Sequence, residues 1–109
     1  MYGIHAEESG PGVRVGMRGE FDVFSLPEMR GTLDGACASG KPVVVDLSGV
    51  TFLDLQSTRE IVVRAMMQSH LLHFKNPSRG VLASVRALGT DAPSRIRTGR
   101  EDFPVFSEA

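Results

Sequence analysis

Few residues in this sequence have the types and spacing that catalysis or metal binding needs. Cys37 is the only cysteine among 109 residues, and its place on the apolar face of a predicted helix favours a buried structural thiol over a nucleophile. His70 and His73 stand three positions apart, a spacing that points two side chains of a strand to opposite faces. Without a third ligand nearby, we expect no metal site. The sequence also lacks a glycine-rich phosphate loop, a serine elbow and paired catalytic carboxylates, so we predict no cofactor and no enzyme activity.

The other polar candidates stand where predicted strands end and helices begin. Asp22 follows a predicted strand and fits a turn. Asp54 or Ser57 fits the N-cap of a helix, and Ser57 and Glu60 also have capping-box spacing. Thr58 falls on the apolar face of the same predicted helix. These residue types therefore have sufficient structural explanations on their own.

The elements that must position these residues alternate along the chain. The spacing predicts a strand over residues 2–7 and another around the alternating Val13, Val15 and Met17. A helix is expected from Ser25 to about residue 40, because Ser25 and Glu28 have capping-box spacing. The expected apolar face of that helix comprises Leu26, Met29, Leu33 and Cys37.

The second half of the chain continues this alternation. Residues 42–47 are apolar and β-branched, which predicts a central strand buried on both faces, with a turn at Ser48 and Gly49. A helix over 56–69, a strand over 71–74 and a helix from about residue 76 to Gly89 follow. Residues 91–93 are expected to start a short helix, and 103–106 to form an edge strand or a docked tail.

Alternating elements predict an α/β fold, with a mixed sheet of four to five strands packed by three to four helices. The length suits a single domain over residues 1–109. The formal net charge is −1 and no block of like charge occurs, so we expect neither nucleic-acid binding nor membrane insertion. A cytoplasmic location is the default expectation. A weak homodimer stays open.

Three segments and their spacing resemble the STAS domain of anti-sigma-factor antagonists, over roughly residues 10–90. Residues 43–54, V-V-V-D-L-S-G-V-T-F-L-D, are similar to the family's V-x-D-L-S-G-V-x-F-x-D almost position for position. Residues 15–22 look like the family's strand ending in G-E-L-D, and residues 72–78 like its strand and N-P-S loop. The resemblance implies a STAS-like fold and a role in binding a regulatory protein.

The sequence departs from the family where the second helix begins. The family has S-S-G or S-A-G after the aspartate, and a partner kinase that is also an anti-sigma factor phosphorylates the first serine. Here Leu55 stands at that position, followed by Gln56 and Ser57. Because Leu55 has no hydroxyl, two interpretations stay open. Either the chain binds its partner without this switch, or Ser57 or Thr58 accepts the phosphate one turn further into the helix.

The resemblance adds a second interpretation of Asp22 and Asp54, as parts of a common surface where the family binds its partner. We predict an anti-sigma-factor antagonist-like regulatory protein that binds an anti-sigma factor or serine kinase-like protein. The alternative is a STAS accessory subunit or scaffold, in a lipid-transport ATPase or a stress-signalling complex. The predicted partner-binding residues are Asp22, Val23, Phe24, Asp54, Leu55, Gln56, Ser57 and Thr58.

Overall fold

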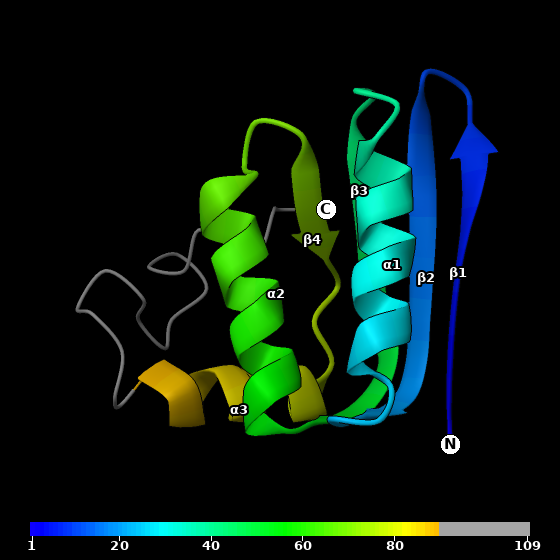
Figure 1. The fold of residues 1–109 in the computed structure, drawn as a ribbon. Coiled ribbons are helices and arrows are strands. Elements are labelled where there is room, and N and C mark those ends of the chain that lie inside the picture. The colour runs from blue at the N-terminus through cyan, green and yellow to red at the C-terminus, as the bar shows by residue number, and fades with distance from the viewer. Residues whose placement is uncertain (90–109) are drawn as a thin grey trace.

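The computed structural model describes residues 1–89 of the chain, which form four strands and three helices (Figure 1). The predicted short helix at 91–93 and the predicted edge strand or tail at 103–106 lie outside the described residues. The strands and helices alternate after an initial hairpin, as the sequence pattern indicates. Their bounds are β1 Tyr2–Ser9, β2 Gly12–Phe21, α1 Leu26–Cys37, β3 Val43–Leu53, α2 Leu55–Met67, β4 Leu72–Lys75 and α3 Arg79–Gly89.

The four strands form one mixed sheet in the order β1-β2-β3-β4. β1 pairs with β2 in the antiparallel sense, whereas β2, β3 and β4 run parallel to one another. Gly19 has a φ of +87°, and a Cβ atom there would lie 2.3 Å from the carbonyl oxygen of Met1. Only glycine therefore allows β2 to approach the backbone at the start of β1 this closely.

Both α1 and α2 lie over the same face of the sheet (Figure 1). The alternating strand residues Val13, Val15, Val43 and Val45 are buried on that face, together with Phe74. The prediction that β3 is buried on both faces is wrong for the described residues. Val44 and Asp46 are only partly buried, because both helices pack on the other face. Each fully buried side chain of this size contributes about 1.5–3 kcal/mol relative to an exposed one.

β3 is longer than the sequence pattern predicts. Ser48 and Gly49 do not form a turn but lie inside the strand, at an irregularity in its pairing with β2. Gly16 pairs with Asp46 and Arg18 with Gly49, so two residues of β3 lie opposite one residue of β2. This is the arrangement of a β-bulge, which bends a strand without ending it. β3 therefore continues to Leu53 and carries the chain directly into α2.

The apolar faces of the helices largely follow the predicted spacing. In α1, Leu26, Met29 and Leu33 are buried as predicted, but Ala36 is buried in the last turn and Cys37 is only partly buried. Burial raises the pKa of the Cys37 thiol. The other buried helix residues are Ser57, Thr58, Ile61, Val62 and Ala65 of α2, and Val81, Val85 and Leu88 of α3; Met66 and Leu82 are half-buried.

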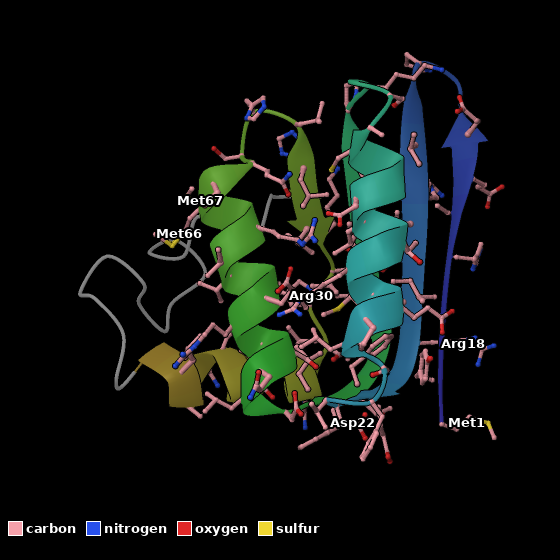
Figure 2. The ribbon with its side chains drawn as sticks, viewed as in Figure 1. Met1, Arg18, Asp22, Arg30, Met66 and Met67 are labelled. Atoms are coloured by element: carbon pink, nitrogen blue, oxygen red, sulfur yellow. The ribbon has the colours of Figure 1, made fainter. Side chains whose placement is uncertain are left out.

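A cluster of charged side chains joins the two neighbouring helices α1 and α2. The Glu60 carboxylate accepts hydrogen bonds from Arg30 at 2.9 Å and from Arg64 at 2.7 Å. Arg64 also donates to Asp34 at 2.8 Å. Figure 2 shows Arg30 between the two helices. Burial opposes the charge of Glu60, but the hydrogen bonds and charges of both arginines outweigh it and lower the pKa of that carboxyl. We call these four residues the α1–α2 seam.

α3 packs against the carboxyl-terminal part of β3 and against α2. It begins at Arg79, where Ser78 accepts a hydrogen bond from the amide of Val81 at 3.2 Å and so acts as the cap. The Ser78 hydroxyl also bonds to the carbonyl of Val50. The Ser84 hydroxyl lies 3.0 Å from the carbonyl oxygen of Leu53. α3 is therefore held directly on the backbone of β3.

Candidate functional site

Two loops meet at the carboxyl ends of β2 and β3. Phe21 and Leu53 are paired at the ends of these parallel strands. The amide of Asp54 donates a hydrogen bond to the carbonyl of Phe21 at 3.0 Å, which ties the start of α2 to the end of β2. Because parallel strands end at the same edge of a sheet, the predicted site residues of both loops are brought together.

Asp22 shapes the loop between β2 and α1. Its carboxylate accepts hydrogen bonds from the amides of Phe24 at 3.0 Å and Ser25 at 3.3 Å, which is the pattern of an Asx turn. The Ser25 hydroxyl points back to the backbone of Asp22 and caps no amide of α1. The predicted capping box of Ser25 and Glu28 is therefore wrong, because the Glu28 carboxylate instead accepts a hydrogen bond from Tyr2.

Asp54 is the N-cap of α2. Its side chain accepts a hydrogen bond from the amide of Ser57 at 2.8 Å. Leu55 is consequently the first residue of the helix, one residue earlier than the pattern predicts. Asp54 satisfies one of the backbone donors that a helix start leaves open, a contribution of typically about 1 kcal/mol. Both aspartates thus have local structural roles, and both stay partly exposed.

Ser57 and Thr58 do not belong to the surface on which they were predicted. Ser57 is fully buried and Thr58 is 1% exposed. The Thr58 hydroxyl donates to the carbonyl of Asp54 at 2.8 Å, and the Ser57 hydroxyl lies 3.5 Å from the carbonyl oxygen of Asp22. These positions follow one turn after the cap, where the helix turns its side chains toward the sheet. Neither hydroxyl is exposed at the surface of this structure.

The other predicted residues are on the surface, and several are apolar. Phe24 is 87% exposed, Leu55 59% and Val23 52%. Phe52 is 49% exposed at the same strand end, although the sequence analysis did not select it. The exposure of Phe52 follows from the alternation of side chains along β3: Leu53 is buried, so the adjacent Phe52 faces outward. We define the strand-end surface as Asp22, Val23, Phe24, Phe52, Asp54, Leu55 and Gln56.

The first residues of the chain border this surface. Figure 2 shows Met1 and Asp22 at the same end of the molecule, whereas Met67 lies at the opposite end of α2. The Tyr2 ring packs on Phe21 with ring centroids 5.3 Å apart. The hydrogen bond to Glu28, together with partial desolvation, raises the pKa of the Tyr2 hydroxyl. The N-terminal strand is thus attached to the first turn of α1 beside the site.

A groove of about 490 Å³ continues the strand-end surface between the start of α2 and α3. Phe52 and Leu55 contribute from one side, and Ala83 and Ala87 from the other. α3 lies very close to the strand here, because a Cβ atom on Gly80 would be 2.3 Å from the carbonyl oxygen of Thr51. Close approach at Gly80 and the serine hydrogen bonds to β3 make this groove a preformed feature of the surface.

The fold and the residue pattern agree with what comparison to known proteins finds. The family model described as "Mlab, STAS domain" matches residues 4–98. The chain belongs to the STAS domain family. No curated protein sequence matches it significantly. The matched range includes every described strand and helix in whole or in large part.

Two solved structures share this fold. An anti-sigma factor antagonist from Mycobacterium paratuberculosis has a TM-score of 0.69 at 18% identity, covering 99% of this chain and 87% of the other. An uncharacterized DUF3478 protein with a SpoIIAA-like fold from Shewanella loihica PV-4 has a TM-score of 0.52 at 13% identity, covering 84% and 80%. The predicted STAS-like fold is therefore confirmed.

Among residues 1–89, no helix is both long and apolar enough to span a bilayer.

Proposed function

We propose that this STAS domain is an anti-sigma-factor antagonist-like regulatory protein that binds an anti-sigma factor of the kinase type through the strand-end surface. The observation that carries the proposal is the exposure of Phe24, in the loop between β2 and α1, and of Leu55, the first residue of α2, at one end of the sheet. Grouped apolar side chains on the surface of a small domain mark a site of protein contact. Burying a side chain such as Phe24 in a complex contributes about 1.5–3 kcal/mol.

The proposed binding needs no catalytic group on this chain. Asp22 and Asp54 hold the two loops by local hydrogen bonds, and their partly exposed carboxylates add polar contacts around the apolar residues. An apolar centre with a polar rim is the usual composition of a transient interface. We therefore propose a binding module rather than an enzyme.

We also propose that this binding is not controlled by phosphorylation at the start of α2. Leu55 occupies the exposed first position of the helix and has no hydroxyl to accept phosphate. Ser57 and Thr58, the nearest hydroxyls of the helix, are buried and face backbone carbonyls. Phosphorylation there would require the first turn of α2 to open and would place a double charge in the core.

The proposal is tested by purifying the tagged chain from its native lysate and identifying bound proteins by mass spectrometry. We expect an anti-sigma factor with a kinase-type ATPase fold to co-purify with the wild type and to be lost with Leu55→Asp. Met67→Ser is the matched control, since Met67 is 75% exposed but lies at the other end of α2. Recovery of no such ATPase, or equal recovery with Leu55→Asp, would contradict the proposal.

The same experiment addresses the phosphorylation part. The intact mass of the chain should not increase by a phosphoryl group after incubation with the recovered partner and ATP. Stoichiometric phosphorylation mapped to Ser57 or Thr58 would show that the first turn of α2 opens.

A second candidate function is an accessory subunit or scaffold of another assembly, such as a lipid-transport ATPase or a stress-signalling complex. The missing hydroxyl at Leu55 favours it, because a constitutive subunit needs no switch at that position. Co-purification distinguishes the two functions. A transport ATPase or a signalling scaffold in place of an anti-sigma factor would select the second.

A further inference from the structure

The groove between α2 and α3 has a floor and walls that do not depend on a partner to form. The Ser84 hydroxyl lies 3.0 Å from the Leu53 carbonyl, and the Ser78 hydroxyl bonds to the Val50 carbonyl. Both bonds fix α3 on the last residues of β3. The side chains that then face the groove from α3 are small, Ala83 and Ala87, while Phe52 and Leu55 supply large apolar groups.

The floor of the groove excludes one common mode of peptide binding. β3 is paired with β2 on one side, and beyond Asp46, where its pairing with β4 ends, α3 covers the other edge with the Ser78 and Ser84 hydroxyls on backbone carbonyls of β3. An incoming peptide therefore cannot add a strand at this position, because β-augmentation needs a free sheet edge. What the groove offers is a helix surface with small side chains beside exposed apolar groups. Such a surface suits the ridge of another helix, since small side chains permit close interaxial distances.

Three arginines lie next to groove residues on the two helices, and Glu20 of β2 lies opposite Phe52 in the sheet register. Arg59 follows Thr58 on α2, and Arg79 and Arg86 flank the groove-facing residues of α3 at a spacing of two turns. All three arginines are exposed. None of their guanidinium groups forms an ion pair or a hydrogen bond with another residue in the described part of the chain. Asp54 is the one acid among the groove residues, and its carboxylate is engaged as the cap of α2.

The two sides of α2 differ in how the arginine of the helix is paired. On the opposite side of the helix, Arg64 is bonded to both Glu60 and Asp34 within the α1–α2 seam. The same helix therefore pairs its cation toward α1 and leaves its cation unpaired toward α3. Unpaired cations around an apolar groove complement acidic groups on an incoming surface.

We propose that the groove between α2 and α3 binds an amphipathic helix of the partner protein, with its apolar side chains against Phe52 and Leu55. Acidic side chains on the edges of that helix then lie beside Arg59, Arg79 and Arg86. This inference rests on the proposed function, because it names the element through which that partner docks. It also assigns α3, which the predicted site did not include, to the interface.

The test uses the full chain, labelled with ¹⁵N, and two synthetic amphipathic peptides of about 15 residues. Both peptides carry leucine at the same positions of one face, flanked by glutamate in the first and by lysine in the second. We expect the glutamate peptide to shift the amide signals of Leu55, Ala83 and Ser84 and to bind about tenfold more tightly than the lysine peptide. A charge reversal, Arg79→Glu with Arg86→Glu, should invert this preference.

Arg14→Glu is the matched control, because Arg14 is an exposed arginine of β2 outside the groove. It should change the affinity for neither peptide. Absence of shifts with both peptides, equal binding of both, or shifts confined to another face would each overturn the inference. Concentration-dependent shifts of the groove signals without peptide would identify a second copy of the chain as the occupant and would also overturn it.

Binding to anionic vesicles of phosphatidylglycerol without any response to the peptides would overturn the inference in favour of a lipid surface. Failure of the peptides while an anti-sigma factor still co-purifies would remove only the groove from the interface. Absence of both peptide binding and co-purification of an anti-sigma factor would contradict the proposed function as well. The two hypotheses are thus distinguishable.

Discussion

The two sides of α2 differ in how their charges and apolar groups are used. Toward α1, the seam of Arg30, Asp34, Glu60 and Arg64 is a closed network in which each charge has an opposite neighbour. Toward α3, the groove is apolar and its arginines have no partner among residues 1–89. Among the residues that the structure describes, α2 therefore separates a side where its charges are paired from a side where its arginine is unpaired.

This difference indicates which surface serves stability and which serves binding. Charges that are largely buried and paired stabilise a fold only when both partners are present, so removing one partner is costly. Exposed apolar groups contribute little to the fold, because they gain little burial on folding. Substitutions at the two sides of α2 should thus change different properties.

Apart from the core control Leu33→Ala, the largest effect is expected where α3 meets β3 beneath the groove. Gly80→Ala would normally favour a helix by about 0.5–1 kcal/mol. Here the new Cβ would lie 2.3 Å from the Thr51 carbonyl oxygen and 2.9 Å from its carbon. Because these are backbone atoms, α3 must move, and we expect a loss of about 2 kcal/mol in the free energy of unfolding. Chemical denaturation measures it.

Gly35→Ala in α1 is the matched control for that substitution. A Cβ atom at Gly35 would have no heavy atom within 4 Å beyond its chain neighbours and the backbone of its own helix, and the residue is exposed. The same change should therefore stabilise the protein by about 0.5–1 kcal/mol. A lower free energy of unfolding for Gly80→Ala and a higher one for Gly35→Ala would support the close contact of α3 with β3. Stabilisation by Gly80→Ala would show that α3 does not approach β3 this closely.

An intermediate effect is expected at the α1–α2 seam. Glu60→Gln removes the charge that Arg30 and Arg64 share, while the side chain of Glu60 is only 17% exposed. We expect a loss of about 1–2 kcal/mol in the free energy of unfolding near pH 7. Glu8→Gln is the control, because the carboxylate of Glu8 is 68% exposed in its pair with Lys41. Its cost should stay below about 0.5 kcal/mol.

The Glu60 effect should depend on pH in a defined direction. Burial acts to raise the pKa of Glu60, but the hydrogen bonds and charges of Arg64 and Arg30 lower it in the folded state below the ordinary value of 4.5. The stabilisation is then fully present above pH 4.5 and is lost as the pH falls through the folded pKa. The stability difference between wild type and Glu60→Gln should shrink on acidification. A stability difference between wild type and Glu60→Gln that grows toward low pH would contradict the stabilising role of the Glu60 charge in the α1–α2 seam.

The sequence allowed prediction of the fold more completely than of the surface. Periodic apolar residues placed the four strands and three helices of residues 1–89, since burial on one face imposes that period. The sequence pattern did not predict that β3 continues through Ser48 and Gly49, because a bulge is a property of the pairing with β2. The predicted cap of α1 was also wrong, because Glu28 accepts a hydrogen bond from Tyr2, which is distant in the sequence.

The candidate site was predictable in position but not in exposure. Asp22 and Asp54 could be placed at strand ends from their neighbours. Whether Ser57 and Thr58 face outward depends on where α2 begins relative to the sheet, and a start at Leu55 turns both inward. The groove could not be derived from local spacing, because it requires the contact of Gly80 with Thr51, which are distant in sequence. Tertiary contacts thus decide which residues of a motif are available to a partner.

The smallest effect on stability is expected at the open side of α2. Leu55→Ser and Phe24→Ser remove side chains that are 59% and 87% exposed, so each should change the free energy of unfolding by less than about 0.5 kcal/mol. Leu33→Ala, at a fully buried leucine beside the seam, should cost about 2–5 kcal/mol under the same conditions. If Leu55→Ser instead cost more than about 1 kcal/mol, Leu55 would be covered in the free protein. The open side of α2 would then be closed like the seam, and the physical basis for partner binding at the groove would be removed.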